Sequence, residues 1–219
     1  MERKSILKST LNTRFITLNG ECTRTIRSDQ IDTCSKTEIL YLQELGICAI
    51  IDLRDLEGCL NICSPHIAQV GINYYNIPVK ECNIYEYFDS MGVKNDVDSR
   101  RIAKADYYVH LLETNLEVFY KIFSLWNKYK GKVLIHCAIG RDRTGIISAI
   151  IQHYIGCSDE EIIREYAISA RNLKELPLEA DKYIDYETAL KIGERFLMLA
   201  KKQNLLNFQV KLTKKEEIK

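Results

Sequence analysis

The 219-residue sequence lacks an apolar run long enough for a transmembrane helix, because no stretch approaches about 18 consecutive apolar residues. It also lacks an excess of charge of either sign, since 31 Lys and Arg residues are balanced by 30 Asp and Glu residues. That balance excludes a general attraction to nucleic acid or to a membrane surface, so any affinity for an anion must come from a local cluster. Residues 1–14 are polar and do not resemble a secretory signal. We therefore expect a cytoplasmic protein without a nucleic-acid partner.

The sequence has no internal repeat, no low-complexity segment and no zinc-ligand spacing. Cys59 and Cys63 lie close together, but the four histidines are scattered along the chain. We therefore expect neither a metal nor another cofactor. There are eight cysteines. A chain of this length can build a hydrophobic core without crosslinks and shows no secretory signal, so we expect reduced thiols and not four disulfides.

Hydrophobic residues make up 46% of the sequence and charged residues 28%. These are the proportions of a globular domain, and they exclude a disordered tail or a coiled-coil rod. At roughly 100–200 residues per domain, residues 1–219 should form a single domain. We expect residues 172–210 to add a helical extension to its core. Residues 211–219 mix Lys and Glu and are expected to fray.

Strand-like and helix-like stretches alternate along the chain. Short apolar runs predict strands, and apolar residues at helical spacing predict helices. The expected strands are 47–53, 74–77 and 132–136, and the expected helices are 35–45, 105–129 with an interruption at Thr114 or Asn115, 146–155, 158–171 and 186–202. Residues 82–104 are polar and are expected to form a long loop. This order predicts an α/β fold: a central, mostly parallel sheet of four or five strands, with strand 132–136 near its centre and helices on both faces.

Residues 136–145, with the sequence HCAIGRDRTG, lie between a predicted strand and a predicted helix. In an open α/β sheet, ligands bind at the carboxyl ends of the strands. The five residues between Cys137 and Arg143 can wrap into a tight loop that Gly140 makes possible, and the backbone N–H groups of such a loop form an anion-binding nest. A helix that begins near Thr144 would add the positive end of its dipole.

These surroundings suit both a reactive thiol and a phosphate group. A helix N-terminus and nearby cations stabilise the thiolate form of a cysteine. The Arg143 guanidinium can hold two phosphate oxygens at once. A Cys137 thiolate below a cradled phosphoryl group is placed for in-line displacement, and water would then hydrolyse the resulting phosphocysteine. An arginine at a helix start without an anion to bind is the less favourable interpretation.

The pattern H-C-x5-R-T-G resembles the phosphate-binding loop of the protein-tyrosine phosphatase superfamily. Its finer form, H-C-x-x-G-[K/R]-D-R-T-G, is similar to the atypical bacterial branch of tyrosine/serine phosphatases, which includes phosphoinositide phosphatases. Further elements that resemble this branch are Arg27–Ser28, Ile50–Arg54 (IIDLR) and Glu165–Ser169 (EYAIS). The sequence departs from the branch at Arg141, where a lysine is usual, and at Asn12–Phe15, which lacks an acidic residue.

The resemblance implies a protein-tyrosine-phosphatase-like fold with Cys137 as nucleophile and Arg143 as phosphate-binding residue. It implies that His136 orients the loop and that the hydroxyl of Thr144 lies near the thiolate and assists release of the phosphate. The implied substrate-binding residues are Ala138, Ile139, Gly140, Arg141 and Thr144.

The leaving group needs a proton, and several carboxyl groups could supply it. Asp142 is the leading candidate, because similar D-R-T loops in myotubularin-like and atypical bacterial enzymes carry the acid within the loop. Many other members of the superfamily carry an aspartate on a separate loop upstream of the cysteine, where Asp96, Asp98 and Asp106 lie in this sequence. Alternatively, Asp142 only pairs with an arginine or accepts a backbone hydrogen bond.

We therefore expect a cysteine-dependent phosphomonoesterase, of the dual-specificity or phosphoinositide type, that forms a phosphocysteine intermediate. Its substrates would be phosphotyrosine and possibly phosphoserine or phosphothreonine in proteins, phosphoinositides, or both. Arg141 beside Arg143 would contact a second phosphate, or would only attract anions. One alternative is a module that binds phosphate esters without turnover. The other is a sulfurtransferase or an arsenate reductase; arsenate reduction needs a resolving thiol, and Cys157 lies beyond the next helix.

Overall fold

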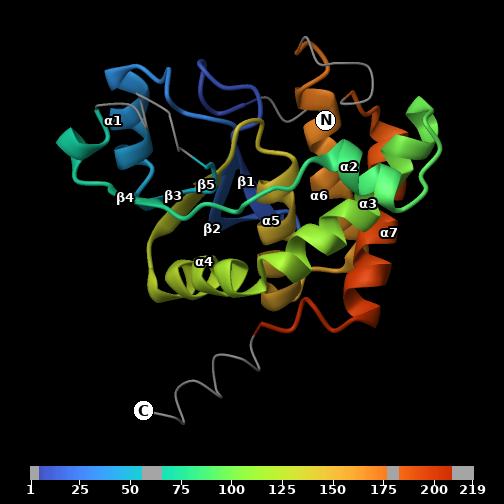
Figure 1. The fold of residues 1–219 in the computed structure, drawn as a ribbon. Coiled ribbons are helices and arrows are strands. Elements are labelled where there is room, and N and C mark those ends of the chain that lie inside the picture. Colours follow the sequence, from blue (N-terminus) through green and yellow to red (C-terminus); the bar gives the residue numbers. More distant parts are fainter. Residues whose placement is uncertain (1–4, 56–65, 177–182, 209–219) are drawn as a thin grey trace.

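The structure is a computed structural model that describes residues 5–55, 66–176 and 183–208. The elements in these ranges alternate between strands and helices (Figure 1). In chain order they are β1 (Arg14–Leu18), β2 (Glu21–Ser28), α1 (Lys36–Glu44), β3 (Ile47–Asp52), the 3-10 turn η1 (Ala68–Val70), β4 (Asn73–Asn76), α2 (Ile84–Ser90), α3 (Val97–Thr114), α4 (Leu116–Lys128), β5 (Lys132–His136), α5 (Asp142–Ile155), α6 (Asp159–Asn172) and α7 (Tyr186–Lys202).

The strands form one sheet in the order β1-β2-β5-β3-β4. The pairs β2–β5, β3–β5 and β3–β4 are parallel, and only β1 runs antiparallel to its neighbour β2. The expected α/β fold with a mostly parallel sheet is confirmed, and β5 occupies the middle position. Because β2 and β3 flank β5 in parallel, their carboxyl ends meet at one edge of the sheet, next to the residue that follows His136.

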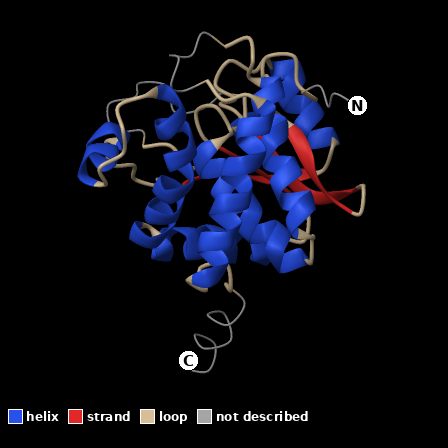
Figure 2. Cartoon of the chain, turned by 90° about the vertical axis from the view of Figure 1, so that its right-hand side faces the viewer, coloured by secondary structure: helices blue, strands red, loops and turns tan. Residues whose placement is uncertain are grey.

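Helices cover both faces of the sheet, as successive residues of the central strand show. Leu134 belongs to a core that also contains Ile39 and Leu42 of α1. Val133 and Ile135 point the other way, into a larger core built with α3, α4, α5, α6 and α7. Figure 2 shows the helices of this larger layer side by side in front of the sheet. Both faces of β5 are therefore buried, which is why its sequence is a continuous apolar run.

Most expected elements are confirmed, and local chemistry explains their ends. Ser35 and Ser158 each form a capping box, with Glu38 and Glu161 respectively, at the start of α1 and α6. The predicted interruption of the long helical stretch is also confirmed, because α3 ends at Thr114 and α4 begins at Leu116.

One expectation about secondary structure is wrong, and one pair of strands was not predicted. Residues 82–104, expected as a loop, contain α2 and the first turns of α3. Asn83 and Asp96 cap these helices with their side chains, and Phe88 supplies the buried contact of α2. The antiparallel hairpin of β1 and β2 was not expected, because the outer half of β2 is exposed and polar. In both places tertiary contacts stabilise elements whose own apolar pattern is weak.

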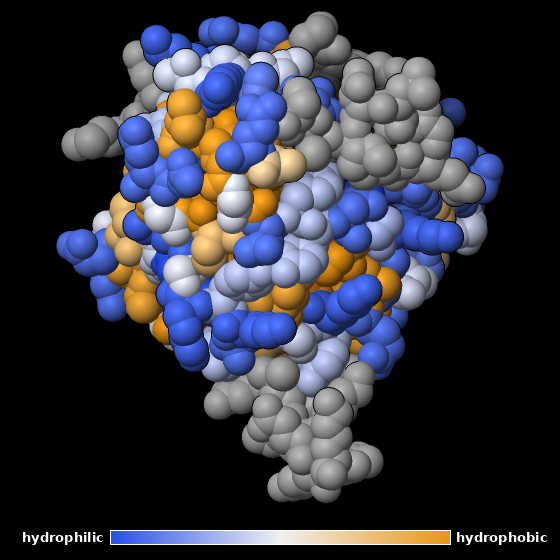
Figure 3. All heavy atoms as spheres, turned by 90° about the vertical axis from the view of Figure 1, so that its left-hand side faces the viewer, coloured by the Kyte–Doolittle hydropathy of each residue, from blue (hydrophilic) through white to orange (hydrophobic). Residues whose placement is uncertain are grey.

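The C-terminal helix packs on the main core. Ile192, Phe196 and Leu197 of α7 are buried there together with residues of α3 and α6. The division of the chain into a core and a 172–210 extension stays a prediction, and residues 211–219, Cys59 and Cys63 lie outside the described residues. No helix in the described part of the chain is long and apolar enough to cross a membrane. The side of the molecule that carries α1 and the edge strand β4 has hydrophobic surface interspersed with hydrophilic side chains (Figure 3).

Candidate active site

The cysteine loop lies at the carboxyl end of β5 and leads directly into α5, which begins at Asp142. A cavity of about 390 Å³ opens above it, lined by Cys137, Ala138, Ile139, Arg141, Asp142 and Arg143 among others. The helix begins earlier than the expected residue 146, so Arg143 and Thr144 lie in its first turn. Six of the sequence-predicted residues therefore meet in one cavity. Of the others, Gly140, Thr144 and His136 lie in or beside the loop but do not line the cavity.

The carbonyl groups of the loop are held from outside the cavity. The backbone N–H of Gln30 donates to the carbonyl of residue 138 at 3.0 Å. The side-chain amide of Asn12 donates to the carbonyls of residues 139 and 140, both at 3.0 Å, and Arg27 Nη2 donates to that of residue 140 at 2.7 Å. Consecutive peptide groups whose carbonyls are held on one side present their N–H groups on the other, which is the arrangement of an anion-binding nest.

Asn12 is fixed by a buried ion pair. Arg14 donates from Nη1 to the Asn12 carbonyl at 3.0 Å and from Nε to Glu165 Oε1 at 2.7 Å. Its Nη2 reaches Ser169 Oγ at 2.9 Å. The N-terminal segment that contains Asn12 and helix α6 therefore meet behind the loop. Both segments were compared with the phosphatase branch in the sequence. Because a buried pair with satisfied hydrogen bonds defines one geometry, this network fixes the position of the Asn12 amide.

Position 140 requires glycine, because there is no room behind it for a side chain. Its φ is 67°, in the left-handed region, and a Cβ atom at this position would lie 2.4 Å from the Ser28 carbonyl oxygen. No side chain fits at that distance. The close approach of the loop to β2 therefore depends on glycine.

His136 is completely buried beneath the loop. Burial lowers the pKa of its imidazole, against the opposing charge of Asp52, whose Oδ2 lies 3.6 Å from Nε2. Its Nδ1 lies 3.3 Å from the Cys137 carbonyl oxygen. Asp52 is itself held by Arg54, which donates to it from Nη2 at 2.7 Å. These contacts fit the expected orienting role of His136.

Asp142, the leading candidate for the proton donor, is engaged as a carboxylate. Arg141 Nε donates to its Oδ1 at 2.9 Å, and the Tyr108 hydroxyl donates to the same oxygen. Burial by itself would raise the pKa of Asp142, but the charges of Arg141 and Lys104 and these hydrogen bonds outweigh it and hold the pKa well below its usual range. A carboxyl group in these surroundings does not readily hold a proton.

The three upstream aspartates do not line the cavity. Asp96 caps α3, with Ser99 donating to it from its backbone at 2.8 Å. Asp98 lies 3.5 Å from Arg101 on the same helix, and Asp106 forms a two-pronged ion pair with Arg195 of α7, with both distances 2.8 Å. Each has a structural partner outside the cavity.

Glu81 was missed by the sequence analysis. It follows β4 and lines the cavity, with its Oε2 3.2 Å from Arg143 Nη2. Burial of its carboxyl group raises the pKa of Glu81, with a smaller contribution in the same direction from Asp142, although Arg143 opposes it. A signal was available, because Glu81 comes soon after a parallel strand, at the sheet edge where the cysteine loop was expected.

One face of α3 supplies a second missed group. Lys104, Tyr107 and Tyr108 occur at helical spacing and line the same cavity as the loop. Tyr85 and Phe88 of α2 extend this wall. These residues come from the segment that was expected to be a loop and from the start of the long helix, and neither was predicted to approach the site.

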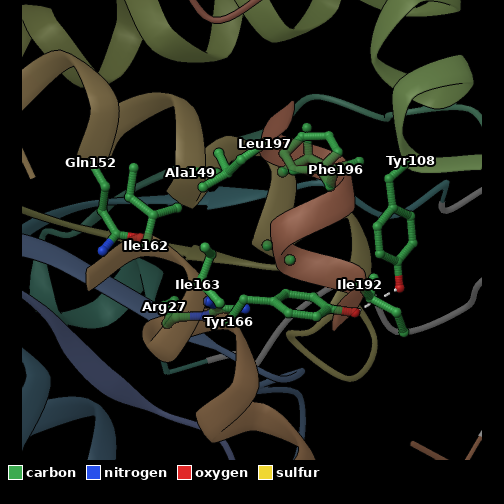
Figure 4. A pocket seen from close by; sticks show the side chains of 13 residues that line it. Arg27, Tyr108, Ala149, Gln152, Ile162, Ile163, Tyr166, Ile192, Phe196 and Leu197 are labelled. Atoms are coloured by element: carbon green, nitrogen blue, oxygen red, sulfur yellow. Dashed lines mark hydrogen bonds between the residues drawn. The ribbon is translucent and has the colours of Figure 1, made fainter. Parts of the chain in front are cut away.

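A second cavity lies behind the loop, between α3, α5, α6 and α7 (Figure 4). It encloses about 20 Å³ and is lined mainly by apolar side chains. Tyr108 borders it as well as the larger cavity, and its hydroxyl lies 3.0 Å from that of Tyr166. Because this volume corresponds to about one water molecule, the space is a packing gap and the larger cavity is the candidate active site.

The described residues contain no group of three or more His, Cys, Asp or Glu side chains that could hold a metal ion. The positive charge of the cavity comes from Arg141, Arg143, Lys104 and the peptide N–H groups. The arrangement can bind a phosphate group next to a thiol.

Comparison with known proteins finds similarity to phosphatases. A model of the tyrosine phosphatase family matches residues 18–215, a region that includes α7. A tyrosine-protein phosphatase of Nostoc commune is 36% identical over 99 residues, which are 45% of this chain and 34% of the relative, so the match spans about a third of that protein. Among solved structures, the core catalytic domain of the PP-IP phosphatase SIW14 from S. cerevisiae is 16% identical with a TM-score of 0.44 and covers 90% of this chain and 94% of its own. TpbA of P. aeruginosa is 15% identical with a TM-score of 0.43 and covers 90% and 95%.

Proposed function

The chain belongs to the tyrosine phosphatase family, and from this premise we propose that it is a cysteine-dependent phosphomonoesterase that forms a phosphocysteine intermediate. The observation that carries the proposal is the shared cavity of Cys137 and Arg143 above a loop whose carbonyls are held outside. In the proposed complex, the N–H groups of residues 138–143 and the Arg143 guanidinium bind the transferring phosphate. The buried Thr144 hydroxyl has no hydrogen-bond partner among the described residues, and in this proposal it assists release of the phosphate.

The first step is an in-line displacement. Cys137 Sγ attacks phosphorus, the S–P bond forms, and the bond from phosphorus to the ester oxygen breaks. The charge that develops on the equatorial oxygens is stabilised by the loop and by Arg143. The departing oxygen takes a proton, which gives the free alcohol or phenol.

We assign that proton to Glu81 in preference to Asp142. The two carboxyl groups line the same cavity, and their surroundings shift their pKa values in opposite directions: burial raises that of Glu81, while Arg141 and Lys104 lower that of Asp142. A separation of this kind supports Glu81 as the acid, because it is the group that holds a proton more readily. Arrival of a phosphate dianion beside Arg143 would displace the Glu81 carboxylate and favour its protonated form further.

The second step is hydrolysis of the phosphocysteine. Glu81, now a carboxylate, takes a proton from water, the water oxygen bonds to phosphorus, and the S–P bond breaks. The products are inorganic phosphate and the regenerated thiolate, so atoms and charge balance over the cycle. In such double displacements the same residue commonly acts as the acid in the first step and as the base in the second.

The cavity walls support an aromatic substrate such as phosphotyrosine. Tyr85, Phe88 and Tyr107 line the space beside the loop. Aromatic rings pack on one another in offset or edge-to-face contacts, which add to the free energy of burial. Phosphoserine, phosphothreonine and phosphoinositides remain part of the proposal, as further substrates of the same site.

The test is phosphate release by the wild-type protein and by Cys137→Ser, in the presence of a metal chelator. The panel contains an aryl phosphate, phosphotyrosine, phosphoserine and phosphothreonine peptides, and phosphoinositides. We expect release by the wild type that is lost in the variant, and a covalent phosphoprotein trapped on acid quench only when Cys137 is present. Binding of phosphate without release from any substrate would instead support the phosphate-ester-binding module.

A further inference from the structure

Two tyrosine hydroxyls lead from α6 to the first residue of α5, and the proposed reaction steps do not use them. The Tyr108 hydroxyl of α3 donates to Asp142 Oδ1 and lies 3.0 Å from the Tyr166 hydroxyl of α6. Figure 4 shows the two hydroxyls pointing toward each other from separate helices. Both tyrosines are buried. We call Tyr166, Tyr108 and Asp142 the hydroxyl chain.

The number of protons fixes the direction of the hydrogen bonds in this chain. A tyrosine hydroxyl donates one hydrogen bond, and an ionised carboxylate only accepts. Because Tyr108 uses its proton on Asp142, Tyr166 donates the bond between the two tyrosines. Burial raises the pKa of Tyr166 to about 12 and raises that of Tyr108 well above its usual value. Both hydroxyls therefore keep their protons near neutral pH.

Asp142 occupies a position from which its carboxylate could block the phosphate site. It is the first residue of α5, and the N–H groups at the start of a helix attract anions. The N-cap residue Arg141 forms no side-chain hydrogen bond to the helix, whereas serine side chains cap α1 and α6. Both carboxylate oxygens accept from side chains instead: Oδ1 from Tyr108 and from Arg141 Nε, and Oδ2 from Arg141 Nη2 at 3.3 Å. These bonds compete with any bond from Asp142 to the N–H groups of the loop.

We propose that Tyr108 and Tyr166 are positioning residues of the proposed reaction, which hold the Asp142 carboxylate against Arg141 and away from the N–H groups that bind the transferring phosphate. This inference rests on the proposed phosphatase function and deepens it. Without the Tyr108 hydroxyl, the carboxylate loses a donor and competes with phosphate for the start of α5. Tyr166 acts one step earlier, because its bond fixes the direction in which the Tyr108 proton points.

The packing of the two rings supports this role. A Cβ atom at Gly145 would lie 3.1 Å from Tyr166 Cδ2, so the ring lies directly against the backbone of α5. The rings of Tyr108 and Tyr166 meet edge to face, with their centroids 6.1 Å apart. Packing as well as hydrogen bonding therefore fixes both hydroxyls relative to the first turns of α5.

The experiment measures the binding of inorganic phosphate by calorimetry and the hydrolysis of an aryl phosphate. The proteins are the wild type, Tyr108→Phe, Tyr166→Phe and the double variant. The matched control is Tyr75→Phe, which breaks another pair of tyrosine hydroxyls, since Tyr75 and Tyr129 lie 2.6 Å apart and neither lines the cavity. Thermal melts by circular dichroism establish that each variant is folded.

These substitutions leave the charges around Asp142 unchanged. The charged groups that act on it or on which it acts are Arg141, Lys104 and Glu81. A change in phosphate affinity therefore reports on the hydrogen bonds of the carboxylate.

We expect Tyr108→Phe to weaken phosphate binding about 10-fold, the lower end of what a hydrogen bond to a charged group contributes, because Arg141 still holds the carboxylate. KM for the aryl phosphate should rise by a similar factor with kcat nearly unchanged, since the lost binding is shared by the ground state and the transition state. Tyr166→Phe should weaken phosphate binding roughly 3-fold, as expected for a bond between neutral groups. The double variant should bind phosphate no more weakly than Tyr108→Phe, and Tyr75→Phe should bind it as the wild type does.

A second comparison tests whether Tyr108 acts through the charge of Asp142. In an Asp142→Asn background no carboxylate competes with phosphate. Adding Tyr108→Phe to that background should therefore leave the phosphate affinity of Asp142→Asn unchanged.

Several results would overturn the inference: additive effects of the two tyrosine substitutions, an equal effect of Tyr108→Phe in both backgrounds, or a lowered Tm or kcat with phosphate affinity intact. If Tyr108→Phe did not fold, equal phosphate affinities of Tyr166→Phe and Tyr75→Phe would overturn it as well. Wild-type protein that releases no phosphate from the aryl ester would instead refute the proposed function itself, whatever the binding results.

Discussion

Glu81 Oε2 lies 3.2 Å from Arg143 Nη2, and this ion pair joins the segment after β4 to the first turn of α5 in the wall of the cavity. The Glu81 side chain keeps 36% of its surface exposed, and that of Arg143 13%. A phosphate at the loop would compete with Glu81 for the guanidinium. In the proposed mechanism, the pair would break when a phosphate binds to Arg143, and Glu81 would then supply the proton.

The first prediction separates the two candidate acids. Glu81→Gln should slow hydrolysis of an alkyl phosphate by roughly 100- to 10,000-fold, the usual contribution of a general acid, and should slow an aryl phosphate with a good leaving group much less. Asp142→Asn should instead reduce both to a similar degree, because it leaves the buried Arg141 without its anion. The reverse pattern in single-turnover assays would return the acid to Asp142.

The second prediction concerns pH. The acid must be protonated in the first step, so the rate of phosphocysteine formation should fall as pH rises through the Glu81 pKa. Because burial raises that pKa, the fall should lie above the range of an ordinary glutamate. Glu81→Gln should remove this limb from the profile of burst rates. A limb that persists in Glu81→Gln would assign it to another group.

The third prediction tests the support behind the loop. Asn12→Ala removes two hydrogen bonds to the loop carbonyls. The residue-140 carbonyl keeps its bond from Arg27, but the residue-139 carbonyl loses its donor. Leaving that carbonyl unsatisfied should lower the free energy of unfolding by about 1–3 kcal/mol. Misplaced N–H groups should also weaken inhibition by inorganic phosphate and lower kcat.

The matched control is Asn73→Ala, which removes one exposed side-chain bond to the Cys48 carbonyl at the edge of the sheet. It should change neither phosphate inhibition nor kcat. If Asn12→Ala lowered stability and left both quantities intact, Asn12 would be a structural residue only.

The fourth prediction concerns Gly140. Gly140→Ala places a Cβ atom 2.4 Å from the Ser28 carbonyl oxygen and also requires a left-handed alanine. We expect loss of phosphate binding, measured by calorimetry, together with a lowered Tm. Gly20→Ala has a similar positive φ of 84° but no atom within 4 Å of the added group, so it should cost only the roughly 1 kcal/mol of backbone strain. Equal effects of the two substitutions would contradict a special role of the close approach.

The sequence by itself determined the sheet centre and the loop. The apolar run 132–136, followed by a cysteine, a glycine and an arginine before a helix, is a local pattern, and a loop closed within a few residues is fixed by local chemistry. The residues that meet in the cavity from this segment, Cys137, Ala138, Ile139, Arg141, Asp142 and Arg143, were all predicted. The helices with clear capping boxes were predictable for the same reason, because their start signals lie within four residues.

Only the tertiary structure decided which residues outside the 136–145 segment lie next to the loop. Glu81 lies 56 positions before Cys137 in the sequence, and Lys104 belongs to a helix whose polar first turns gave no sign of burial. Their roles depend on the parallel pairing of β4 with β3 and on the packing of α3 over the site, which no short pattern encodes. The state of Asp142 was decided in the same way. The sequence placed a carboxylate in the loop, but the hydrogen bond from Tyr108, the ion pair with Arg141 and burial set its pKa, because these depend on what surrounds the group in space.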